Sequence, residues 1–122
     1  MLDTNICIYL LSNSMPSLTQ RVAQCDAQSL VISAIVFAEL TLGSAQGKLP
    51  PRHVLDAFIS EVPLLPFDED AARVYATLKF RRGSFDRLIA AHALSVGLTL
   101  VTANGADFAE VPGLVVENWT AP

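Results

Sequence analysis

Apolar positions along this chain alternate between short continuous runs and longer segments in which they recur every three to four residues. The short runs are typical of buried strands and lie at 29–33, 62–67, 98–102 and 114–117, with a very short strand-like segment at 1–3. The longer segments predict helices over 4–11, 16–25, 34–43, 52–62, 68–82 and 86–96. Strands and helices are therefore expected to alternate along the chain.

Local signals indicate where several of these helices begin and end. Ser33 and Ser84 are of the type that caps a helix N-terminus, and Pro16 stands in a first turn, where its missing N–H is tolerated. Gly43 or Gly47 is expected to end the helix that starts after Ser33.

The alternation predicts βαβ crossovers and an α/β fold with a parallel sheet covered on both faces. The run 62–67 contains two prolines, which favour an edge position. Ligands of such sheets bind beyond the carboxyl ends of the strands. Asp3 ends the first strand and Asp107 follows the strand that ends at Thr102, so both acids are expected at that edge.

Composition indicates one ordered domain over residues 1–122, because 52% of the residues are hydrophobic and only 16% are charged. A surface so poor in charge suggests that a partner covers part of it. No signal peptide is present and no apolar run reaches the roughly 18 residues of a membrane helix. We therefore expect a cytoplasmic protein without membrane contact.

The net charge of −4 argues against wholesale wrapping of nucleic acid. Its distribution is more informative, because four of the eight basic residues lie within nine positions around Asp86. They are Lys79, Arg81, Arg82 and Arg87.

The cysteines and histidines do not indicate a zinc site. Cys7 and Cys25 lack metal-ligand spacing, and Cys7 in I-C-I-Y-L-L is expected to be a small buried hydrophobe. His53 and His92 are isolated, and His92 in A-A-H-A-L is expected to be a packed core or interface residue.

Four acids stand where an apolar element ends or turns polar: Asp3, Glu39, Asp86 and Asp107. Taken singly, Asp3 and Asp107 could be helix or turn caps, and Asp86 could be a first-turn acid favoured by the helix dipole. Glu39 is different, because the segment 31–42 around it is almost entirely apolar. A carboxylate in such a helix is costly to bury unless Arg, Lys or a metal ion compensates it.

If these acids converge, their repulsion requires compensation. Mg²⁺ or Mn²⁺ suits an all-oxygen site, and a bound ion would lower the pKa of water and neutralise charge on a phosphodiester. The residues therefore favour a small metal-dependent nuclease, with Arg81, Arg82 and Arg87 binding substrate phosphates. An ordinary solvated helix end explains the same basic residues.

Four segments, in order and across nearly the whole chain, resemble the PIN-domain ribonucleases and in particular the VapC-type toxins of toxin–antitoxin pairs. These segments are M-L-D-T-N-I-C, S-A-I-V-F-A-E-L-T-L-G, D-R-L-I-A-A-H-A-L and L-V-T-A-N-G-A-D-F-A-E-V-P-G-L-V-V-E-N-W. The resemblance implies a three-layer α/β/α domain with a central parallel sheet.

The resemblance also implies roles for single residues. Asp3, Glu39 and Asp86 match the core acids of a Mg²⁺ or Mn²⁺ site, with Asp107 as the fourth acid. Asn104 would assist as a neutral ligand or water orienter, and Asn5 would fix the first carboxylate. The chain departs from the family in a shortened segment, 83–85, directly before Asp86.

By the same resemblance the protein is an endoribonuclease toxin that forms a homodimer and is inhibited by a cognate antitoxin, in a heterotetramer or larger assembly. A phospho-acceptor signalling domain also places acids at strand ends, but it requires a Lys after the last strand, where this chain has E-N-W-T-A-P. An aspartyl-phosphate phosphatase requires D-x-D, where this chain has Asn5 as the third residue of the motif. A PIN-like binding module without catalysis is the remaining alternative.

Overall fold

The computed structural model describes residues 1–79 and 84–120. The helices are α1 (Thr4–Leu11), α2 (Pro16–Ala23), α3 (Ala34–Ala45), α4 (Arg52–Glu61), α5 (Glu69–Tyr75) and α6 (Phe85–Ser95). The strands are β1 (Ile32–Ser33), β2 (Leu64–Leu65), β3 (Leu100–Val101) and β4 (Val116–Glu117), and the 3₁₀ turns are η1 (Ala27–Ser29) and η2 (Gly105–Phe108). Strands and helices alternate as predicted.

The N-terminal segment joins two pairs of parallel strands. β1 pairs with β2, and β3 pairs with β4. Between the pairs, the Leu2 N–H donates to the Val31 carbonyl at 3.0 Å, and the Asp3 N–H donates to the Val101 carbonyl at 2.9 Å. The order is therefore β2–β1–(residues 1–3)–β3–β4, which confirms the parallel sheet and the edge position of the run 62–67.

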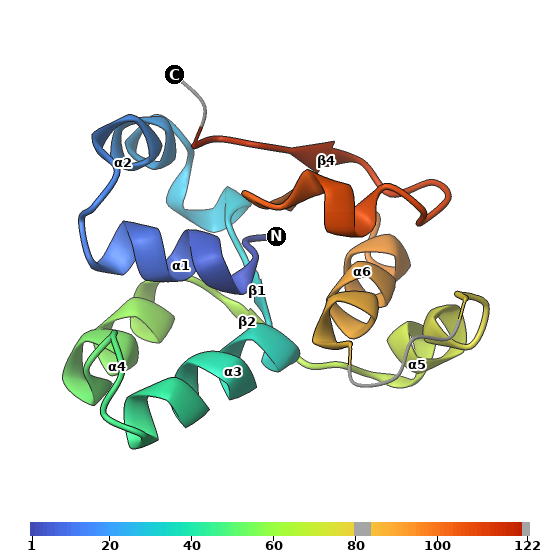
Figure 1. Ribbon diagram of the computed structural model, residues 1–122, viewed down its shortest axis with the longest axis horizontal. Helices are drawn as coiled ribbons and strands as arrows, with labels where there is room; N and C mark the ends of the chain where they lie inside the picture. The colour runs from blue at the N-terminus through green and yellow to red at the C-terminus, as the bar shows by residue number, and fades with distance from the viewer. Residues whose placement is uncertain (80–83, 121–122) are drawn as a thin grey trace.

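Helices lie on both sides of these strands. In Figure 1, α1, α2 and α4 lie to the left of the central strands and α5 and α6 to the right, with α3 below. The core between them contains the fully buried side chains of Leu2, Ile6, Ile32, Ile89 and Leu100. Across the described residues, no helix has the length and apolar character needed to span a bilayer.

The predicted capping residues occupy the predicted positions. Ser33 caps α3 by accepting from the Ile35 N–H at 3.0 Å, and Ser84 caps α6 by accepting from the Arg87 N–H at 3.4 Å. Pro16 lies in the first turn of α2. Of the two glycines expected to end this helix, Gly43 lies inside α3, and Gly47 follows the helix with a left-handed φ of +78°.

The helix predicted over 68–82 is too long. α5 ends at Tyr75, and the backbone then forms tighter three-residue turns, with the Thr77 N–H donating to Val74 O at 3.0 Å. The Thr77 hydroxyl donates to the same carbonyl at 2.7 Å, so a local side chain competes with helix continuation. The predicted end at Gly83 lies outside the described residues.

Candidate active site

Asp3 is placed by the strand that precedes it and by the helix that it caps. Its side chain is buried, with 5% relative exposure. One carboxylate oxygen accepts from the Thr4 N–H at 2.8 Å, and the other accepts from the Thr102 hydroxyl at 2.7 Å. The Thr102 hydroxyl in turn accepts from the Asn104 N–H at 3.0 Å. Both oxygens of Asp3 are therefore held, and the carboxylate has one orientation.

Glu39 comes to the same place from α3. Its Oε1 accepts from the Thr4 hydroxyl at 2.8 Å, so Thr4 contacts both Asp3 and Glu39. The Glu39 side chain is half-buried, less enclosed than its apolar sequence surroundings suggested. No Arg or Lys among the described residues forms an ion pair with it.

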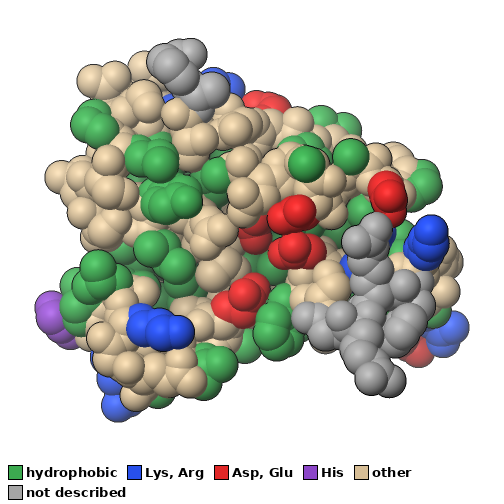
Figure 2. Space-filling model, in the orientation of Figure 1, with side chains coloured by type: hydrophobic (Ala, Val, Ile, Leu, Met, Phe, Trp, Pro, Cys, Tyr) green, Lys and Arg blue, Asp and Glu red, His purple; other side chains and the backbone are tan. Residues whose placement is uncertain are grey.

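Asp86 and Asp107 line a hollow of about 210 Å³ between α6 and η2, together with Ser84, Arg87 and Glu110. Asp86 is a first-turn residue of α6, and Asp107 is a first-turn residue of η2. Asp107 is exposed to solvent and Asp86 is half-buried. Figure 2 shows acidic side chains gathered near the middle of one face of the molecule, with hydrophobic side chains around them.

The pKa shifts record how close these acids lie. Burial raises the pKa of Asp3, against the hydrogen bonds from Thr102 and Thr4, and the charge of Asp107 adds to the rise. Burial likewise raises the pKa of Glu39, with further contributions from the charges of Asp3 and Asp86. Burial raises the pKa of Asp86 as well, followed by the charges of Asp3 and Asp107. The charge of Asp3 thus acts on Glu39 and Asp86, and the charge of Asp107 acts on Asp3 and Asp86.

The PIN domain family matches residues 1–114. This chain belongs to that family.

Known proteins and solved structures are similar to this chain over nearly its full length. The tRNA(fMet)-specific endonuclease VapC of Shigella flexneri is 36% identical over 129 residues, covering 98% of this chain and 97% of the relative. The VapBC2 structure from Rickettsia felis, bound to a DNA fragment from its promoter, has a TM-score of 0.86 at 33% identity, covering 98% and 97% of the two chains. VapBC-1 from nontypeable Haemophilus influenzae has a TM-score of 0.82 at 34% identity, covering 99% and 98%.

The donor set of this PIN domain suits a hard dication bound partly through water. Carboxylate oxygens are the ligands that Mg²⁺ and Mn²⁺ prefer, and Mg²⁺ takes one or two of them directly while keeping several waters. Within 1–79 and 84–120, no three or more His, Cys, Asp or Glu side chains lie close enough together to hold a metal ion. A dication here would therefore be held by at most two of these side chains and by water.

The basic residues near Asp86 differ from one another in their placement. Arg87 is buried, at 4% exposure of its side chain, and pairs with Glu110 at 3.4 Å, so it lies in the wall of the hollow and not on an open surface. Lys79 is exposed. The predicted substrate residues Arg81 and Arg82, and the first residue of the shortened segment 83–85, lie outside the described residues.

The hydrogen bonds that hold Asp3 come from Thr4 and Thr102, which sequence reasoning did not single out for this role. Asn5 is half-buried in the first turn of α1, and its role at Asp3 stays a prediction. Asn104 is exposed, and its backbone N–H supports Thr102. The signal for Thr4 was its position next to Asp3, and the signal for Thr102 was its position at the end of an apolar strand.

Cys7 and His92, which were not expected to bind a metal ion, both lie in the core. Cys7 is fully buried, as predicted, and His92 is packed in the core at 1% exposure. Neither residue lines the hollow between α6 and η2.

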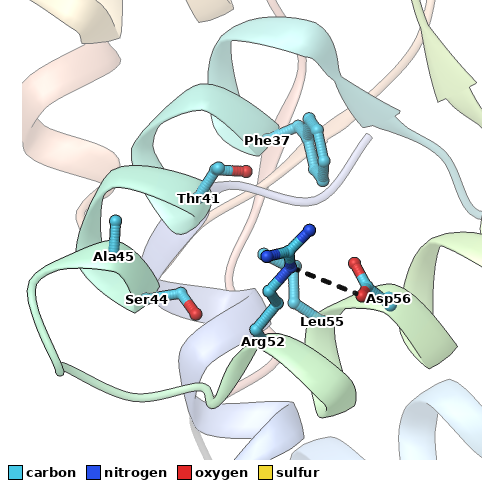
Figure 3. Close-up of a pocket in the computed structure, with 7 residues that line it drawn as sticks. All are labelled: Phe37, Thr41, Ser44, Ala45, Arg52, Leu55 and Asp56. Carbon is cyan, nitrogen blue, oxygen red and sulfur yellow. Dashed lines mark ion pairs between the residues drawn. The ribbon is translucent and has the colours of Figure 1, made fainter.

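A second hollow, of about 300 Å³, lies between α3 and α4 (Figure 3). Phe37 and Thr41 line it, each two positions from Glu39 and hence roughly 200° around the helix from that acid. Arg52 and Asp56 of α4 form an ion pair at 3.9 Å at its edge. None of the four acids lines this hollow.

Proposed function

We propose that this protein is a Mg²⁺- or Mn²⁺-dependent endoribonuclease, the toxin of a toxin–antitoxin pair. The observation that carries the proposal is that Thr4 joins Asp3 to Glu39 while Asp86 and Asp107 line one hollow, so that acids from the start of α1, from α3, from α6 and from η2 act on one another's charges. The relatives named as VapC ribonucleases over almost the whole chain support the same activity.

Each acid has a role that fits its surroundings. Asp3 and Asp86 would hold the metal, because Asp3 is fixed at both oxygens and Asp86 faces the hollow. Glu39, held by Thr4, and Asp107, exposed beside Asp86, would orient the attacking water. The bound ion would lower the pKa of that water and neutralise charge on the phosphodiester.

The raised pKa values of Asp3, Glu39 and Asp86 support a cation site. Burial is the largest cause of each rise and the charges of neighbouring acids add to it, and a bound dication would offset both effects. The hollow beside Asp86 and Asp107 is open to solvent at the exposed acids and would admit a phosphate of the substrate.

A cognate antitoxin and a homodimer belong to the same proposal. Two of the structural neighbours are described as VapBC assemblies. The described surface also exposes large apolar side chains, among them Leu42 at 57%, Leu49 at 61% and Val115 at 59%. Apolar side chains exposed to this degree favour coverage by a protein partner.

The direct test is RNA cleavage by purified protein with Mn²⁺ and, in parallel, with excess EDTA. Asp86→Asn should reduce cleavage at least 100-fold while the circular dichroism spectrum stays native, because the side chain keeps its size and loses its charge. Asp26→Asn, an exposed acid outside the site, is the matched control and should cleave normally. Full activity of Asp86→Asn, or cleavage unaffected by EDTA, would contradict the proposal. RNA binding without cleavage by the unmodified protein would indicate the binding module instead.

A further inference from the structure

A buried polar contact joins the two helices that carry Glu39 and Asp86. The Ser33 hydroxyl and the His92 Nδ1 lie 2.7 Å apart, and the two residues are 0% and 1% exposed. Ser33 caps α3, and His92 is the eighth residue of α6. Nothing in the proposed chemistry uses either side chain.

The surrounding hydrogen bonds assign the direction of this contact. The Ser33 oxygen already accepts from the Ile35 N–H at 3.0 Å, which leaves its single proton to be donated. A buried hydroxyl proton without an acceptor is costly, and His92 Nδ1 lies within reach of it, so we assign Ser33 as the donor and the Nδ1 of a neutral His92 ring as the acceptor. Burial lowers the pKa of His92, against the charge of Asp68, and so favours the neutral ring that this bond requires.

The His92 ring is also held from a second side. Phe67 packs edge-on against it, with 5.5 Å between the ring centroids and 78° between the planes. Phe67 lies two residues after the edge strand β2 and directly before Asp68, the cap of α5. The ring therefore contacts elements on both sides and has little freedom to turn.

The contact lies at equal distances along the chain from the two acids. Glu39 is six residues after Ser33, and Asp86 is six residues before His92. Six helical residues correspond to about 9 Å along each axis. A helix moves as a rigid rod over so short a length. A shift of α6 against α3 at this contact would therefore change the distance between the Glu39 and Asp86 carboxylates.

We infer that His92 is a positioning residue that, through Ser33, sets the separation of Glu39 and Asp86 for cation binding. The inference rests on the proposed function. Loss of the contact should weaken Mn²⁺ binding about tenfold, the lower end of what residues behind metal ligands contribute.

Three variants separate positioning from simple stability. His92→Leu removes the acceptor, and His92→Asn restores one at the place of Nδ1. Leu18→Ala, in the core of α2, lowers stability without touching the contact. Mn²⁺ affinity by calorimetry, and kcat and KM for RNA cleavage, are measured for each variant.

His92→Leu should bind Mn²⁺ about tenfold more weakly, with kcat lowered and KM for RNA little changed. His92→Asn should recover most of both values, and Leu18→Ala should keep the affinity of the unmodified protein. If His92→Leu matches Leu18→Ala in Mn²⁺ affinity and kcat, the inference is wrong while the proposed function stands. An unmodified protein that neither binds Mn²⁺ nor cleaves RNA would overturn both.

A second comparison decides the question if His92→Leu does not fold. His92→Gln carries its amide one carbon further from the backbone than His92→Asn, and it should therefore not reach the Ser33 hydroxyl in the same place. Weaker Mn²⁺ binding by His92→Gln than by His92→Asn supports the positioning role, and equal binding contradicts it.

Discussion

At the scale of single residues, two threonines orient the carboxylates of Asp3 and Glu39. Thr4 donates its backbone N–H to Asp3 and its hydroxyl to Glu39, and Thr102 donates to the other oxygen of Asp3. Hydrogen bonds to a carboxylate favour its charged form, so these donors partly offset the cost of burial. The charge of the site is thus maintained by neutral neighbours.

The variant Thr102→Val tests how far Asp3 depends on the hydrogen bond from Thr102. The isosteric change removes the donor to Asp3 and the acceptor for the Asn104 N–H, so we expect a loss of about 1–3 kcal/mol in the free energy of unfolding. The pKa of Asp3 should rise further. Urea unfolding and an NMR titration of the carboxyl measure the two effects. Thr41→Val, at an exposed position, should stay within about 0.5 kcal/mol, and an equal loss in both variants would contradict the assignment.

Glu39→Gln should stabilise the metal-free protein at pH 7.5. The raised pKa of Glu39 means that the folded protein binds this proton more tightly than the unfolded chain, so the carboxylate lowers stability as the pH rises through that pKa. The amide oxygen can still accept from Thr4. The gain should disappear below pH about 4, under the ordinary pKa of a Glu. Thermal unfolding in EDTA from pH 3.5 to 8 tests this, with Asp26→Asn showing little change.

At the scale of elements, helix starts could be predicted from sequence and one helix end could not. Ser33 and Ser84 cap their helices through contacts within three residues, so the necessary information is local. The end of α5 depends on competition from the Thr77 hydroxyl for a helix carbonyl, which the apolar pattern over 68–82 conceals. Placement of Arg87 likewise depended on Glu110, distant in the sequence, and basic character alone suggested an open surface.

Replacing Gly97 and Gly43 by alanine should change the free energy of unfolding in opposite directions. Gly97 follows α6 at φ +67° with nothing within 4 Å of an added Cβ, so Gly97→Ala should cost about 1 kcal/mol through backbone conformation alone. Gly43 lies inside α3 with an added Cβ 3.9 Å from the Lys48 Cβ, an ordinary contact. Gly43→Ala should therefore gain up to about 1 kcal/mol. Chemical unfolding of both variants checks the pair, and changes of the same sign would contradict it.

At the scale of the whole molecule, the alternating pattern predicted the α/β class and the parallel sheet, but not the strand order. The central position of residues 1–3 follows from hydrogen bonds to Val31 and Val101. These partners are far apart in the sequence, and no local signal in M-L-D distinguishes a central strand from an edge. The placement of Asp3 depends on this order, because residues 1–3 bring Asp3 beside Thr102.

Cation binding should stabilise the whole fold. If Mn²⁺ binds only the native state, a concentration 100-fold above its dissociation constant adds about 2.7 kcal/mol to the free energy of unfolding. Differential scanning calorimetry with and without Mn²⁺ measures the shift. Asp86→Asn should lose most of it, and Asp26→Asn should retain it. An unchanged shift in Asp86→Asn would place the ion elsewhere.

The strand at residues 1–3 has a consequence for synthesis. Its partner Val101 leaves the ribosome almost a hundred positions later, and pairings so distant in sequence form late in folding. A nascent chain can pair residues 1–3 with the segment at Val31 early, but Asp3 lacks Thr102 and Asp107 until those residues have been synthesised. The site proposed here is accordingly incomplete in any nascent chain that ends before residue 107.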